Sequence, residues 1–174
     1  MRYFLIDALN VLYGCGEFQK LLPQNLPAAA AQLERLLSAL GPDRQALLVY
    51  DGGAAGAVPE STAVHSGLTV LRTPTGIGAD GLLVELVRRI RRGDPGAAVT
   101  VVSDDGGLQA ATAALGGEPL HCDALLKQLQ QRELELQRRL KRRSEDLGRW
   151  WPGRLGERLG PSTGGRPLRE DLGR

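Results

Sequence analysis

The sequence predicts an α/β protein with a parallel sheet flanked by helices. Short apolar runs alternate with amphipathic helical segments through the first 122 residues, the pattern of successive right-handed β–α–β crossovers. Three of these runs end in an aspartate, namely Asp7, Asp51 and, after Ser103, Asp104. A short continuous apolar run is typical of a strand buried on both faces.

The expected elements follow one another at short intervals. The strands are expected over 2–7, 46–51, 68–72, 98–103 and 118–121. Helices are expected over 28–40, 80–92 and 106–115, where apolar residues recur on one face and glycines mark two of the ends. Because glycine and proline are frequent in 8–27 and 52–67, we expect an irregular segment and a loop there.

The chain divides into three expected regions. Residues 1–122 form the main domain, 123–151 form one long basic helix, and 152–174 form a mobile tail rich in glycine, proline and charge. Leucines on the long helix follow a near-heptad stripe: Leu126, Leu129, Leu136, Leu140 and Leu147. We expect this stripe to dock on the domain, the alternative being a coiled-coil partner.

The charge is unevenly distributed along the chain. Residues 1–131 hold 10 Lys and Arg against 13 Asp and Glu, whereas residues 132–174 hold 12 against 7. A mildly acidic body with a basic arm fits an anionic partner such as RNA. On charge alone, a solvated helix and tail explain the pattern equally well.

The two cysteines and the lengths of the apolar runs predict where in the cell the protein lies. Cys15 and Cys122 are far apart in sequence and form no CxxC pair, which argues against a zinc site and a disulfide scaffold. No apolar run reaches the ~18 residues of a membrane span, and we expect no secretory leader. The sequence therefore predicts a cytoplasmic protein without a membrane partner, and it leaves the oligomeric state open.

Aspartates at the ends of strands are the strongest functional signal. The carboxyl ends of parallel strands share one edge of a sheet, so Asp7, Asp51 and Asp104 converge there, and Asp80 opens a helix nearby. Clustered carboxylates repel one another, which suggests a bound divalent cation. We predict Asp7, Asp80 and Asp104 as catalytic ligands of Mg²⁺ or Mn²⁺, with Asp51 as a fourth ligand, direct or through water.

Structural roles compete with this interpretation. Asp80 also fits a helix cap, and Asp51, before two glycines, also fits the start of a turn. We expect Asp105 to cap the following helix rather than bind metal. Asp7 is harder to explain without function, because a charge at the end of a buried strand is costly unless it has a partner.

Such a cluster suits hydrolysis of a phosphodiester by water. Bound divalent ions lower the pKa of a coordinated water and stabilise charge on the attacking and leaving oxygens, so no protein nucleophile is needed. The only histidines are His65, for which we expect no site role, and His121, for which we expect a structural role.

Four segments carry a resemblance to a known family. They are FLIDALNVL at 4–12, LVYDG at 48–52, GAD at 78–80 and VVSD at 101–104. In this order and spacing the chain resembles the YacP-like branch of the NYN nucleases, within the PIN-like superfamily, over residues 1–131 and the basic helix that follows. Where that family has Asp-Gly-Tyr-Asn, this chain has Asp7, Ala8, Leu9 and Asn10. The change puts in question the shape of the turn and any stacking by the lost aromatic ring.

The resemblance implies a PIN-like, Rossmann-like sheet and a metal-dependent endoribonuclease. It places Asp7, Asp80 and Asp104 at the family's acidic positions, Asp51 at the acid after the second strand, and Asn10 at the motif asparagine. Because the family includes a ribosome-associated enzyme that cuts mRNA, the ribosome becomes a candidate partner. We therefore expect cleavage of single-stranded RNA, leaving a 5′-phosphate and a 3′-hydroxyl.

Several polar residues are candidates for substrate contact. Asn10 either binds a phosphate or orients Asp7, or else closes an Asx-turn, and Ser103 either supports a ligand carboxylate or satisfies the strand end. Arginines on the long helix are candidates for the RNA backbone, although a solvated helix face is the alternative. The expected contacts there are Arg138, Arg139, Arg142 and Arg143.

Two other functions remain as alternatives. A non-catalytic module on the same fold would bind RNA or the ribosome without cutting. A phosphohydrolase or nucleotide-binding domain is disfavoured, because Asp7 is not part of an Asp-x-Asp pair and no glycine-rich phosphate loop follows the first strand.

Overall fold

The computed structural model describes residues 1–22, 25–41, 43–52, 59–65, 67–74 and 76–150. The tail predicted over 152–174 lies outside these residues. The chain divides into two compact units, Met1–Glu135 and Leu136–Arg174. No helix within the described ranges has both the length and the apolar character of a membrane span.

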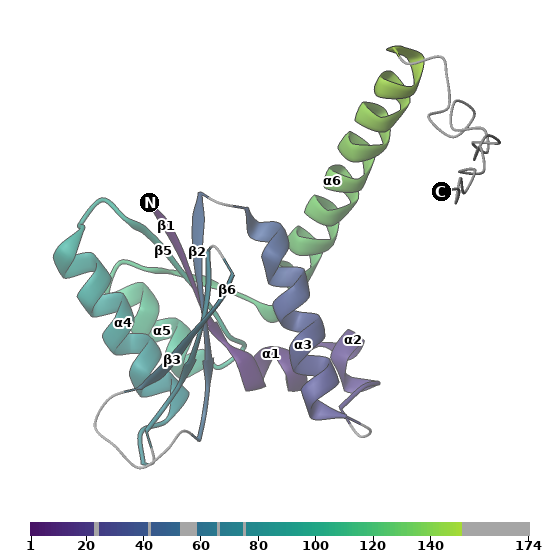
Figure 1. Cartoon of the computed structure of the whole chain (residues 1–174). Coiled ribbons are helices and arrows are strands. Elements are labelled where there is room, and N and C mark those ends of the chain that lie inside the picture. The colour runs from purple at the N-terminus through teal and green to yellow at the C-terminus, as the bar shows by residue number, and fades with distance from the viewer. Residues whose placement is uncertain (23–24, 42, 53–58, 66, 75, 151–174) are drawn as a thin grey trace, which may run out of the picture. The chain divides into compact units, whose positions relative to one another are not determined.

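A six-stranded, mostly parallel sheet forms the centre of the first unit (Figure 1). Its strands are β1 (Arg2–Asp7), β2 (Arg44–Tyr50), β3 (Glu60–His65), β4 (Leu68–Arg72), β5 (Ala98–Val102) and β6 (Glu118–Leu120). Their order across the sheet is β3-β4-β2-β1-β5-β6, and only the β3–β4 pair is antiparallel. The predicted fold class is confirmed, and β1 lies between β2 and β5.

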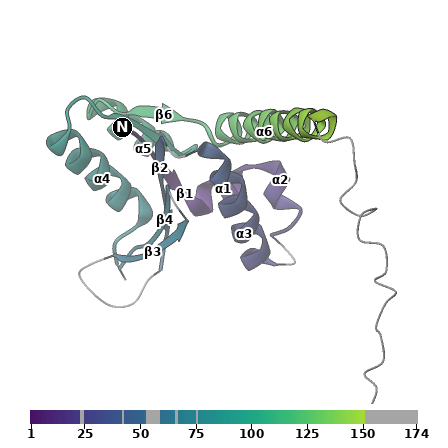
Figure 2. The ribbon, with the colours of Figure 1, turned by 45° about the horizontal axis from the view of Figure 1, so that its top comes forward.

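Helices cover both faces of this sheet. They are α1 (Ala8–Gly14), α2 (Gly16–Gln19), α3 (Leu26–Leu37), a 3₁₀ turn η1 (Ser38–Leu40), α4 (Ala79–Gly93), α5 (Gly106–Ala114) and α6 (Cys122–Trp150). In Figure 2, α4 and α5 lie on one side of the sheet and α1, α2 and α3 on the other. The predicted helices correspond to α3, α4, α5 and α6.

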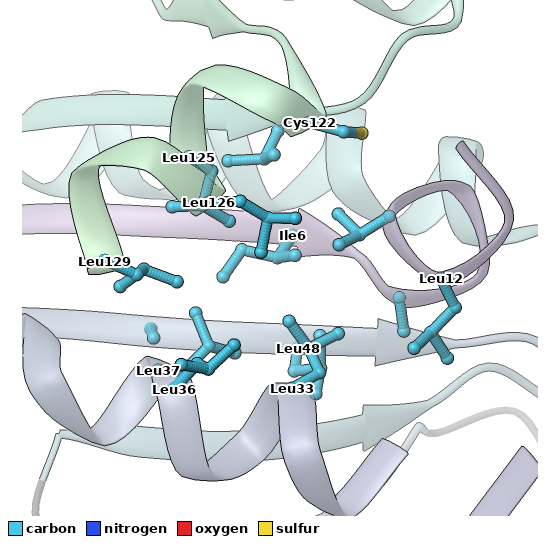
Figure 3. Close-up of a cluster of buried hydrophobic side chains, with 14 of the residues drawn as sticks. Ile6, Leu12, Leu33, Leu36, Leu37, Leu48, Cys122, Leu125, Leu126 and Leu129 are labelled. Carbon is cyan, nitrogen blue, oxygen red and sulfur yellow. The ribbon is translucent and has the colours of Figure 1, made fainter. Parts of the chain in front are cut away.

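Each face of the sheet has its own apolar core. Phe4 and Ile6 of β1 point toward the core built by α1, α3 and the start of α6, whereas Leu5 points toward α4 and α5. Figure 3 shows Ile6 and Leu48 of the sheet among leucines of α3 and α6. This alternation along a strand with no exposed face explains the continuous apolar runs in the sequence.

Two sequence expectations are corrected. The irregular segment expected over 8–27 contains α1 and α2, because Asp7 caps α1 and that helix packs Val11 and Leu12 into the core. The loop expected over 52–67 contains β3. This strand forms because its backbone pairs with β4, a contact that the neighbouring glycines and prolines conceal in the sequence.

Both edge strands are irregular. The β3–β4 pairing shifts register between Ala63 and His65. At the opposite edge, β6 has only three residues and contains Pro119, which has no backbone N–H.

The leucines of α6 differ in burial. Leu125, Leu126 and Leu129 belong to the core that includes α3, and Leu129 has no exposed surface. Leu136 and Leu140, in the second unit, are 46% and 66% exposed. Of the predicted stripe, Leu126 and Leu129 are thus buried. The structure does not describe the side chain of Leu147.

Truncating leucines along α6 provides a test of this packing. We expect Leu129→Ala to lower the free energy of unfolding by about 2–5 kcal/mol, because it leaves a cavity in the core. The same substitution at Leu134, which is 52% exposed, should cost less than about 1 kcal/mol. Urea unfolding measures both, and equal losses would contradict the burial of the α6 start.

Candidate active site

Asp7 ends the central strand and lies at the carboxyl edge of the sheet. The chain leaves β1 toward β2 on one side and leaves β5 toward β6 on the other, so the β1–β5 boundary is a topological switch point. Open α/β sheets place their ligands at such a point. The carboxylate of Asp7 accepts the backbone N–H of Asn10 at 3.0 Å and so caps α1.

The electrostatic surroundings of Asp7 oppose its negative charge. Burial raises its pKa above the ordinary value; the Asn10 N–H acts in the opposite direction, and the nearby carboxylates of Asp80 and Asp51 raise the pKa further. Only 8% of the residue is exposed. Among the described residues, no lysine, arginine or histidine forms an ion pair with it.

Asp51 joins the end of β2 to the start of α4. Its Oδ1 accepts the backbone N–H of Ala79, and the hydroxyl of the fully buried Thr73 lies 3.4 Å from the same oxygen. The side chain therefore holds the first turn of α4 beside the sheet edge, and with it Asp80.

Asp80 is an exposed carboxylate in the first turn of α4. The N-cap of that helix is Gly78, and within the described part of the chain no group donates a hydrogen bond to the Asp80 side chain. Partial burial raises the pKa of Asp80, and the charges of Asp105 and Asp51 raise it further. Asp7, Asp51 and Asp80 therefore form one mutually repelling group.

Asp104 is held by a different set of contacts. Its Oδ1 lies 2.9 Å from His121 Nδ1 and accepts the backbone N–H of Cys122 at 3.2 Å. Burial raises the pKa of Asp104, but these hydrogen bonds outweigh it and leave the pKa below its usual value. The Asn10 amide oxygen accepts the Asp104 N–H at 2.8 Å and the Cys122 thiol at 3.3 Å. Asn10 thus ties the end of β1 to the loop after β5.

The second oxygen of Asp104 faces the last residue of α1. A Cβ atom added to Gly14 would lie 3.2 Å from Asp104 Oδ2. Glycine at this position therefore leaves room for the carboxylate.

The other predicted site residues have varied positions. Ser103 is buried and its hydroxyl accepts the Asp105 N–H at 3.1 Å, and Asp105 caps α5 through the Leu108 N–H at 2.7 Å, as predicted for it. The four arginines lie in the second unit, where their side chains are exposed: Arg138, Arg139, Arg142 and Arg143.

The oxygen donors fit Mg²⁺ or Mn²⁺ only as a water-rich site. Among the described residues, no three His, Cys, Asp or Glu side chains are grouped closely enough to hold a metal ion together. Mg²⁺ usually keeps several waters and uses one or two carboxylates besides substrate phosphates. A cation near Asp7 would also relieve the repulsion from Asp51 and Asp80.

Thr73, His121 and Cys122 support the site but were not predicted to do so. His121 and Cys122 directly follow β6, the last strand. Residues that follow parallel strands meet at the carboxyl edge of the sheet, so the position that identified the aspartates as site candidates also applies to these two residues. Thr73 likewise follows β4.

Comparison with solved structures identifies the class of fold. The chain matches the crystal structures of Rae1 (YacP) from Bacillus subtilis and of a mutant of it, with TM-scores of 0.68 and 0.69, each at 16% identity. Both matches cover 91% of this chain and 90% of the other. The fold is therefore the PIN-like NYN fold. No curated protein matches the chain.

The family follows from the sequence match. The model of the YacP-like NYN domain matches residues 4–158, and this chain belongs to that family. Membership supports a nuclease-like role in RNA processing.

The buried charge of Asp7 predicts a pH-dependent gain in stability on neutralisation. Because burial and the nearby carboxylates raise the pKa of folded Asp7 above its ordinary value, ionisation of Asp7 destabilises the fold. This loss of stability is absent at a pH below the pKa of Asp7 in the unfolded chain, and it is complete at a pH above the pKa of Asp7 in the folded protein. Asp7→Asn keeps a capping side chain and should raise the thermal unfolding midpoint at pH 7 but not at pH 3.

Asp43→Asn is the matched control, since it removes an exposed carboxylate before β2 and should show no such gain. A midpoint for Asp7→Asn that falls at pH 7 would contradict the repulsion described above.

Proposed function

We propose that this protein is a metal-dependent endoribonuclease that cleaves single-stranded RNA by attack of water on the phosphodiester. The observation that carries the proposal is Asp7, a nearly buried carboxylate at the topological switch point, repelled by Asp80 and Asp51 and without a basic partner among the described residues. A structural carboxylate in such a place would be expected to have a cation beside it.

The chain's residues divide the work of the proposed site. Asp7 and Asp80 would hold Mg²⁺ or Mn²⁺, with Asp51 binding the cation directly or through water. Asp104 would offer its Oδ2 as a further ligand oxygen. His121 and Cys122 hold Oδ1 of Asp104 and so fix its orientation. When bound, the metal would lower the pKa of a water and offset the charge that builds on the phosphodiester oxygens.

Asn10 and Tyr13 support substrate placement on α1. Asn10 fixes the backbone of Asp104. Tyr13, one helical turn later, is 58% exposed and offers an aromatic face on which a base can stack. Tyr13 follows Leu9, which stands where the family motif has its tyrosine, by four residues on α1, a spacing that places the two on the same side of a helix.

The exposed arginines of α6 are the proposed contacts to the RNA backbone. Arg138, Arg139, Arg142 and Arg143 carry charge that phosphates would neutralise with release of counterions. The family resemblance extends the proposal to message presented by a translating ribosome.

A non-catalytic RNA-binding module is the second candidate. It is favoured by one observation: within the described ranges no three potential ligands are grouped for a metal. Tight, salt-sensitive RNA binding without cleavage, in solution and on translating ribosomes, would establish this function instead.

The direct test is cleavage of labelled single-stranded RNA with Mg²⁺, Mn²⁺ or EDTA. We expect the wild type and Asp43→Asn to cut only with metal, and Asp7→Asn to lose at least about 100-fold in rate, because a ligand charge is lost. The products should carry 5′-phosphates. Full activity of Asp7→Asn would overturn the site assignment.

A second test moves Asp104 without altering its charge. Gly14→Ala should slow cleavage by about tenfold, because the new methyl group displaces Oδ2 of Asp104. Gly16→Ala is the matched control, since nothing lies within 4 Å of its added Cβ, and it should cut like the wild type. Equal rates for the two variants, measured with saturating Mn²⁺, would contradict the proposed role of the position of Asp104 Oδ2 in cleavage.

A further inference from the structure

A groove of about 280 Å³ opens at the amino ends of the strands, at the opposite end of the sheet from Asp7. Its lining includes Phe4, Thr100, Glu118 and, from α6, Gln128. Five residue steps along β1 separate Arg2 from Asp7, or ~16 Å at the usual rise of a strand. The groove is therefore distinct from the proposed catalytic site.

Two arginines stand side by side at this groove. Arg2 and Arg44 are register partners on the neighbouring parallel strands β1 and β2, and both line the groove. Because side chains alternate along a strand, Arg2 lies on the same face as Phe4. The Arg44 guanidinium lies over the Phe4 ring, 5.4 Å from its centroid, so this contact holds it in place.

A third arginine reaches the same region from α6. Arg132 donates to the backbone carbonyl of Leu40 at 2.8 Å. Burial lowers the pKa of Arg44, the charges of Arg132 and Arg2 lower it further, and Asp43 opposes the shift. The three guanidiniums therefore form a like-charged group, in which the Phe4 ring holds Arg44 and the Leu40 carbonyl holds Arg132.

Within the described residues, no ion pair joins these three arginines to a carboxylate. Glu118 lines the groove and Asp43 lies near Arg44, but in the described part of the chain neither forms an ion pair with Arg2, Arg44 or Arg132. Arginine clusters without carboxylate partners suit phosphate groups, whose oxygens match the planar donors of guanidinium.

We propose that the groove lined by Arg2 and Arg44, with the charge of Arg132 nearby, is a phosphate-binding site. Its ligand is either a phosphodiester of single-stranded RNA or the phosphate of a free nucleotide. The inference goes beyond the proposed nuclease, because binding at this end of the sheet does not require cleavage at the other.

The test uses the full chain carrying Arg2→Gln and Arg44→Gln together. Binding of a fluorescent oligouridylate is measured by anisotropy in EDTA, so that RNA stays intact, and binding of uridine monophosphate by calorimetry. The matched control is Arg88→Gln with Arg89→Gln, which removes two exposed arginines that pair with Glu85 on α4. If loss of the Arg44–Phe4 contact unfolds the double variant, binding is measured with Arg2→Gln alone.

For an RNA ligand, we expect the groove variant to bind the oligouridylate about tenfold more weakly than the control. Its slope of log affinity against log salt should also be smaller by about 1.4, the value for two lost phosphate contacts on a single strand. For a nucleotide ligand, oligouridylate binding stays equal and only binding of uridine monophosphate is lost. Either result supports the site.

Equal binding of both probes by the groove variant and the control would overturn the proposal. Cleavage with Mn²⁺ is measured on the same proteins. RNA cleavage together with equal binding by the groove variant and the control would overturn only the phosphate site. Binding through the groove without any cleavage would overturn only the proposed nuclease activity.

Discussion

The rest of the structure depends on one buried strand that ends in a charge. β1 lies between β2 and β5 and is covered on both faces, so Phe4, Leu5 and Ile6 are apolar and buried up to Asp7 at the sheet edge. The same carboxylate begins α1. One residue thus marks the end of the central strand, the start of the first helix and the middle of the proposed site, and this limits what it can be replaced by.

Repulsion and support are separated within the site. The charges of Asp80 and Asp51 raise the pKa of Asp7, and those of Asp105 and Asp51 raise the pKa of Asp80, whereas hydrogen bonds from His121 and Cys122 lower the pKa of Asp104. The fold maintains the first group because Asp51 is tied to the backbone of α4. In the proposed metal site, such a division would leave Asp7 and Asp80 to neutralise the cation, with Asp104 oriented beforehand by its hydrogen bonds.

The features that the sequence predicts correctly depend on local signals. The runs before Asp7 and Asp51, and the cap at Asp105, depend on neighbours along the chain, and all were found at their predicted places. Prediction failed where a partner lay far away. β3 exists because it pairs with β4, and α1 was hidden because Asp7 serves as strand end and cap at once.

The same limit applies to the site. The contacts that hold Asp104 in place come from Asn10, 94 residues earlier, and from His121, 17 residues later. Such pairs depend on tertiary folding, and no periodicity reveals them. The aspartates were recognisable because strand ends are recognisable, but which of them would be free and which engaged was not.

The irregular edges of the sheet limit how copies of this protein can associate by strand pairing. An exposed edge with regular backbone groups is a template on which a second chain can add a strand. Here the β3 edge is interrupted by the shift between Ala63 and His65, and the β6 edge is three residues long and includes Pro119. In the described residues neither edge presents a long uninterrupted ladder, so the sheet resists growth into a larger intermolecular one.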